Sequence, residues 1–74
     1  MVVEKNYRVD GLVKRRGLFT VHLRRANGSR FGVEVKRSAA VAKKLDELIK
    51  LPYAKRKNTP VWMENGEIID VVLP

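Results

Sequence analysis

Few side chains in this chain belong to the types that catalyse reactions. His22 is the only histidine, cysteine is absent, and there are two serines, one beside a turn signal and one at a predicted helix start. Neither a nucleophile with a paired base nor a cluster of histidine and cysteine metal ligands can be assembled from this set. Glu64 and Glu67 flank a turn signal and could lie close together as an acid and base pair, but a solvated turn is the simpler interpretation. The sequence therefore predicts no enzyme, no cofactor and no metal site.

Charge is the strongest chemical feature of the chain. Sixteen Lys and Arg against eight Asp and Glu give a net charge of +8 over 74 residues. All the basic residues precede residue 58, and the charged residues that follow are Glu64, Glu67 and Asp70. A field of this kind attracts polyanions, and contacts to phosphate release counterions. DNA or RNA is therefore the first partner that the sequence predicts.

The length and composition indicate one small domain, residues 1–74. A chain of this size buries only about 60% of the surface that its unfolded form exposes, and without cysteine no disulfide can reinforce it. No apolar run approaches the roughly 20 residues of a membrane span, and the N-terminus does not have the pattern of a secretory signal. We expect a cytoplasmic protein that does not bind membranes.

Alternation of apolar and polar residues predicts three strands in the first half. In residues 7–13 the odd positions would face a core, with Leu12 interrupting the pattern and Gly11 marking a bend or bulge. The next two strands alternate cleanly. Their inward residues are Phe19, Val21 and Leu23, then Phe31, Val33 and Val35.

The Asn27-Gly28 turn joins the second and third strands, and side-chain parity predicts its length. A three-residue loop with Gly28 in the left-handed conformation keeps apolar residues on one face, whereas a two-residue loop mixes apolar and charged residues. The three-residue loop pairs Leu23 with Phe31. On the outer face it pairs Arg24 with Arg30 and His22 with Gly32, and the two arginines repel each other unless a polyanion relieves them.

The second half predicts one helix and one hairpin. Ser38 is the expected N-cap of a helix over residues 39–50, whose buried stripe is Val41, Leu45, Leu48 and Ile49, and Pro52 ends it. A loop over residues 53–59 follows. Residues 61–64 and 67–73 then form strands joined by a two-residue type I′ turn at Asn65-Gly66, a register that pairs Trp62 with Ile69 and puts Trp62 in the core.

The order of three strands, a helix and two strands is that of a small five-stranded OB-fold barrel, and the predicted fold class is mainly β with one helix. The first half resembles the bacterial translation initiation factor 1 family at Gly11, Val13, the run 19–23 and the Asn27-Gly28 turn. The resemblance implies an OB-fold and nucleic-acid binding. The sequence after the helix departs from that family, so its ribosomal role is not carried over. An SH3-like barrel is the alternative fold.

In an OB-fold the ligand lies on the outer surface of the second and third strands and on the flanking loops. With Phe19, Phe31 and Trp62 assigned to the core, Tyr7 and Tyr53 remain as the candidates for stacking on bases, so we expect contacts mostly to the nucleic-acid backbone. The predicted nucleic-acid-binding residues are Lys14, Arg15, Arg16, His22, Arg24, Arg30, Lys36, Tyr53, Lys55, Arg56 and Lys57.

A protein-interaction module is the alternative function. The same basic face could dock on an acidic protein, or the acidic and apolar last strand, residues 68–73, could pair with a strand of another chain. A homodimer in which the acidic last segment meets the basic face of a second copy is one form of this alternative.

Overall fold

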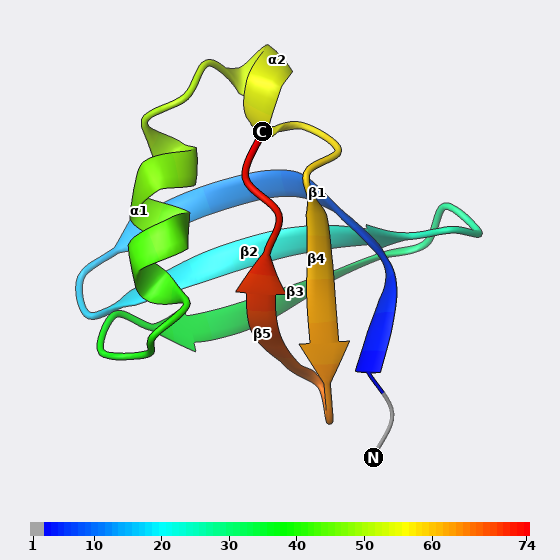
Figure 1. Ribbon diagram of the computed structural model, residues 1–74, viewed down its shortest axis with the longest axis horizontal. Helices are drawn as coiled ribbons and strands as arrows, with labels where there is room; N and C mark the ends of the chain where they lie inside the picture. The colour runs from blue at the N-terminus through cyan, green and yellow to red at the C-terminus, as the bar shows by residue number, and fades with distance from the viewer. Residues whose placement is uncertain (1–2) are drawn as a thin grey trace.

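Five antiparallel strands form a single sheet, and two short helices lie between the third and fourth strands along the chain (Figure 1). The computed structural model describes residues 3–74, and the side chains from residue 7 onward. The elements are β1 (Val3–Arg15), β2 (Leu18–Arg25), β3 (Arg30–Lys36), α1 (Ala42–Ile49), α2 (Tyr53–Arg56), β4 (Pro60–Glu64) and β5 (Glu67–Val71). The predicted class, mainly β with the helical segment after three strands, is confirmed.

The sheet has the order β3-β2-β1-β4-β5, so the long strand β1 lies at its centre. In Figure 1, β4 and β5 cross in front of β2 and β3 while α1 covers one side. The buried core lies between these layers, because β2, β4, β5 and α1 all contribute fully or almost fully buried side chains to one cluster. Within residues 3–74 no strand pairing joins β3 to β5, so the sheet is open where a closed barrel was expected.

The β2–β3 hairpin has the register that the sequence predicts. Leu23 pairs with Phe31, His22 with Gly32 and Arg24 with Arg30. Gly28 has φ +89°, and its N–H donates to the carbonyl oxygen of Arg25, which closes the three-residue loop. Phe19, Val21 and Leu23 are fully buried, as the alternation predicts.

A bulge interrupts β1 beside Gly11, as expected, but its effect on the side chains was not foreseen. The register shifts between Val9 and Gly11, so Asp10 is the extra residue. Val9 and Leu12 are three positions apart, and a regular strand would place them on opposite faces. The bulge lets Leu12 pack against the core that buries Val9, and it leaves Val13 40% exposed. The prediction that Val13 faces inward is wrong for this reason.

The β4–β5 hairpin keeps the predicted turn but not the predicted register. Asn65 and Gly66 both have positive φ, 52° and 78°, as a type I′ turn requires. A register shift then pairs Trp62 with Asp70 in place of Ile69. Trp62 is half-buried and lies between Val61 and Met63, both of which face the core, so it belongs to the opposite face of β4 and does not fill the core.

The helical segment begins later than predicted and contains a second helix. Residues 37–41 form turns, with the Ala39 N–H donating to the carbonyl of Lys36 and the Ala42 N–H to that of Ala39, so Ser38 is not the N-cap. Val41 occupies the cap position, and α1 spans eight residues. The expected loop after Pro52 contains the four-residue helix α2. Of the predicted inward residues, Val41, Leu45 and Leu48 are buried and Ile49 is half-buried.

Candidate nucleic-acid interface

Backbone hydrogen bonds fasten the end of α2 to β1 beside the bulge. The Asn58 N–H donates to the carbonyl oxygen of Val9 at 2.8 Å, and the Val9 N–H donates to that of Thr59 at 2.9 Å. Thr59 is buried, and its hydroxyl donates to the carbonyl oxygen of Arg56 at 2.8 Å. Asn58 has φ +66°, a left-handed turn that brings the chain from α2 onto β1. The position of α2 over the sheet is therefore set by the backbone.

A hollow of about 250 Å³, here called the α2 groove, opens between α2 and the outer face of β1 and β2. Its walls combine the bulged stretch of β1 with residues from two other elements. The lining residues are Val9 to Val13 of β1, His22 of β2, and Tyr53, Arg56 and Lys57 in and after α2. Four of the predicted binding residues, from segments about thirty positions apart, thus surround one hollow.

His22 lies between two glycines on the neighbouring strands. A Cβ built on Gly11 would lie 3.5 Å from the imidazole, and one on Gly32 would lie 3.8 Å from it. Both are ordinary contact distances, so the fold does not require either glycine for steric reasons. Because neither neighbour carries a side chain, the exposed imidazole stands on an open strip of backbone across three strands.

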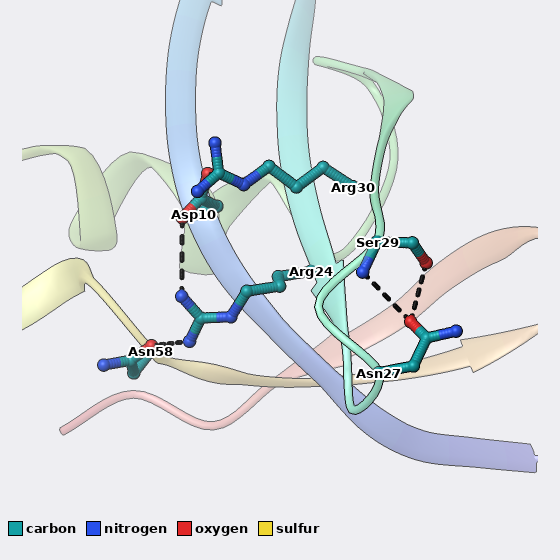
Figure 2. Close-up of polar contacts among 6 residues, drawn as sticks. All are labelled: Asp10, Arg24, Asn27, Ser29, Arg30 and Asn58. Atoms are coloured by element: carbon teal, nitrogen blue, oxygen red, sulfur yellow. Dashed lines mark hydrogen bonds and ion pairs between the residues drawn. The ribbon is translucent and has the colours of Figure 1, made fainter.

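The carboxylate of Asp10 lies between the two arginines of the β2–β3 hairpin (Figure 2). Its carboxylate lies 3.6 Å from Arg24 and 3.3 Å from Arg30, and Arg24 also donates to the side-chain oxygen of Asn58. The repulsion that a polyanion was expected to relieve is therefore relieved within the chain. The same network links β2, the bulge and the segment after α2, so it also supports the wall of the α2 groove.

The basic residues of α2 have no such compensation. Among the side chains of residues 7–74, none of the ion pairs involves Lys55, Arg56 or Lys57. Tyr53 is 54% exposed, and the guanidinium of Arg56 lies 6.0 Å from the centre of its ring. The other aromatic candidate, Tyr7, is half-buried and packs edge-on against Phe31 with ring centres 5.4 Å apart. Tyr53 is the ring that the fold leaves open to a ligand.

The remaining predicted residues lie away from the groove. The bulge turns Lys14 toward α1, where its ammonium lies 2.9 Å from the carboxylate of Asp46 and, mainly by that bond, lowers the pKa of Asp46. Arg15 donates to the Thr20 hydroxyl at 3.2 Å. Arg15, Arg16 and Lys36 are exposed near the β1–β2 turn, about 20 Å along β2 from Arg24 by strand geometry.

Three residues that the sequence did not single out belong to the site. Arg8 pairs with Arg24 in the β1–β2 ladder, which places three arginines in one row across the sheet. The alternation had already put Arg8 on the water side, so this signal was present. The bulge directs Asp10 toward Arg24, and the positive φ of Asn58 directs its side chain there as well, so residue type alone did not indicate either residue.

The described residues contain no group of three or more His, Cys, Asp or Glu side chains able to hold a metal ion. No helix among them has the length and apolar character needed to cross a membrane. The surface thus presents cations, one carboxylate, an imidazole and a phenol ring around a single hollow.

No known protein family, curated protein or solved structure matches this chain.

Proposed function

We propose that this protein binds nucleic acid without catalysing a reaction, through α2 and the outer face of β1 and β2. The observation that carries the proposal is the uncompensated basic run Lys55 to Lys57, held by backbone hydrogen bonds beside the arginine row of the sheet. Cations that have no acidic partner among the described side chains are available to phosphate oxygens, and the ordered backbone lowers the entropy lost on binding.

The fold supports this function if it is assigned to the OB-like class. The helix joins β3 to β4, and β1 pairs with both β2 and β4, as in that class. The unpaired edges β3 and β5 face each other across a hollow of about 280 Å³ that Val35 and Ile68 help to line. We infer an OB-like barrel left open at this seam, with the α2 groove on its outside.

The test is a titration at two salt concentrations against duplex DNA, single-stranded DNA and structured RNA. The logarithm of the affinity should fall with the logarithm of salt by about 0.9 for each neutralised duplex phosphate, or about 0.7 for a single strand. Lys55→Gln combined with Lys57→Gln should weaken binding and flatten this slope. Lys43→Gln on α1 with Lys50→Gln at its C-cap makes the same change of charge and is the matched control.

Salt-insensitive or undetectable binding to every probe would remove the proposal. Equal losses in the α2 and α1 double variants would mean that net charge alone attracts the probes, without a site.

A homo-oligomer is the second candidate, and exposed apolar residues near the C-terminus favour it. Ile69, Val72 and Leu73 are 45%, 46% and 37% exposed, and the edge of β5 is unpaired within the described chain. A second copy could cover this segment by strand pairing. Light scattering at low and high salt measures the mass, and a monomer at both would eliminate this candidate.

A further inference from the structure

We propose that the α2 groove holds one unpaired base, so that the ligand is a single strand of RNA or DNA. This inference rests on the proposed function and narrows it, because duplexes, in which every base is paired, are excluded from the groove. It also differs from the backbone recognition that the sequence predicts, since it adds a pocket that takes the base.

The size of the groove fits a single base. At about 250 Å³ it lies just below the roughly 300–1,000 Å³ typical of sites for drug-sized ligands. A single ring system is smaller than such ligands, whereas a base pair together with its stacked neighbours cannot enter a hollow walled by α2 on one side and β1 on the other. A base must therefore leave its stack to reach the groove.

The lining favours the base over the phosphate. Leu12, Val13 and Gly11 supply apolar lining, and the rings of His22 and Tyr53 line the groove together with them. Aromatic side chains hold bases of any sequence by stacking, because every base has a π-face. The carboxylate of Asp10 also lines the groove, and a negative charge there repels a phosphate but not a neutral base.

The cations stand where the phosphates on either side of that base would pass. Lys57 and Arg56 line the groove, Lys55 is exposed on the same helix, and Arg24 is bonded to Asn58 at the junction of α2 with β1. A strand that placed one base in the groove would run its backbone along these residues. The base would then fix the register of the strand, and the cations would supply the salt-dependent part of the affinity.

The experiment measures fluorescence anisotropy of labelled oligonucleotides of about 12 nucleotides, within the roughly 4 to 16 that one small single-strand-binding domain covers. One RNA and one DNA of the same mixed sequence are compared with hairpins whose two strands are joined by a polyethylene glycol linker in place of a nucleotide loop, so that every base is paired and the number of phosphates is about the same. At equal salt we expect at least one of the single strands to bind at least about tenfold more tightly than its hairpin. The RNA and DNA arms show which sugar is preferred.

Two sets of variants locate the base. Tyr53→Ala should weaken single-strand binding by about tenfold while leaving hairpin binding within about twofold, and Tyr53→Phe, which keeps the ring, should retain binding. Gly11→Ala places a methyl group in the groove and should also weaken single-strand binding. Gly32→Ala adds the same methyl group on the other side of His22, outside the groove, and is the matched control. Circular dichroism confirms that each variant folds.

The outcomes separate this inference from the proposed function. Hairpins that bind as tightly as single strands, or a folded Tyr53→Ala variant with unchanged affinity, would overturn the base-binding groove and leave salt-dependent nucleic-acid binding standing. Equal effects of Gly11→Ala and Gly32→Ala would also overturn it. Absence of binding to all four probes at low salt would overturn both proposals.

Discussion

Two hairpins of this protein, β2–β3 and β4–β5, are built from similar signals, yet only one keeps a regular register. In β2–β3, partners remain in step from Leu18 and Lys36 to Arg24 and Arg30. In β4–β5, the register shifts between Met63 and Trp62. Both hairpins turn at an Asn-Gly pair whose glycine has positive φ. The turn therefore fixes the position of a hairpin, whereas the residues of its strands determine whether the register stays regular.

The reason lies in the spacing of the inward residues. The inward residues of β2 are two positions apart along the strand, so all of them reach the core without distortion. In β5, Ile68 and Val71 are both buried although they are three positions apart, and an extra residue, Ile69, makes this possible. The bulge in β1 has the same origin at Val9 and Leu12. An odd spacing of buried residues is thus what produces the irregularities.

The largest expected difference between the hairpins concerns their aromatic residues. Phe19→Ala removes a fully buried ring, and we expect it to lower the free energy of unfolding by about 3–5 kcal/mol. Trp62→Ala removes a half-buried ring from the outer face of β4 and should cost at most roughly 2 kcal/mol. Urea denaturation followed by circular dichroism measures both.

Phe19→Leu is the milder variant if Phe19→Ala does not fold, with an expected cost of about 1 kcal/mol. If Trp62→Ala cost more than Phe19→Ala, the tryptophan would belong to the core, and the orientation of β4 with Val61 and Met63 inward would be wrong.

The turns should respond alike, because both glycines have positive φ. Gly28→Ala and Gly66→Ala each force an alanine into the left-handed region, at a cost of about 1–2 kcal/mol in unfolding free energy. Gly32→Ala, in a strand and without positive φ, is the control and should be close to neutral. A much smaller cost at Gly66 than at Gly28 would mean that the second turn is not held in the type I′ conformation.

The regular parts of the fold were predictable from the sequence, and the irregular parts were not. Alternation gave the inward residues of β2 and β3, and parity gave the length of the loop between them. Parity fails at a bulge, because one extra residue reverses every side chain beyond it. Lys14, which lies beyond the bulge of β1, was therefore assigned to the binding surface and lies against α1. Trp62 was assigned to the core, but β4 buries its neighbours Val61 and Met63 and so leaves Trp62 on the opposite face.

The candidate site was predictable as a set of residue types but not as a hollow. The basic run after Pro52 and the outward histidine are visible in the sequence, and they belong to the α2 groove. Their meeting depends on the backbone bonds between Val9 and residues 58–59, which no side-chain pattern indicates. Long-range contacts made by backbone atoms leave little trace in residue type, so the groove could not be predicted from the sequence.

Asp10 of β1 forms ion pairs with the β2–β3 hairpin, and its replacement should change stability and binding in opposite directions. Asp10→Asn breaks the ion pairs with Arg24 and Arg30, and we expect the free energy of unfolding to decrease by about 0.5–1 kcal/mol, since the pairs are partly exposed. The same change releases two arginines and removes a negative charge, so affinity for nucleic acid should increase by several fold. Urea denaturation and anisotropy titration measure the two effects. Weaker binding by a folded variant would mean that the carboxylate itself contacts the ligand.

The smallest expected effect on stability concerns Asp70 in the β4–β5 hairpin and appears only at low pH. The Lys44 ammonium bonds to Asp70, and the Val71 N–H donates to the same carboxylate, so the pKa of Asp70 lies below its ordinary value of 3.8. The folded state then binds fewer protons than the unfolded state. The resulting stabilisation is complete well above pH 3.8 and is lost as the pH falls through the lowered pKa.

Lys44→Met removes the main cause of the shift, so unfolding curves of the variant recorded between about pH 5 and pH 2 should show a weaker pH dependence than those of the parent protein. Because Asp46 carries a similar shift through Lys14, some dependence should persist in the variant, and Lys14→Met combined with Lys44→Met should reduce it further. An unchanged pH profile in the double variant would show that neither ion pair stabilises the fold and that α1 is held to the sheet by its buried face alone.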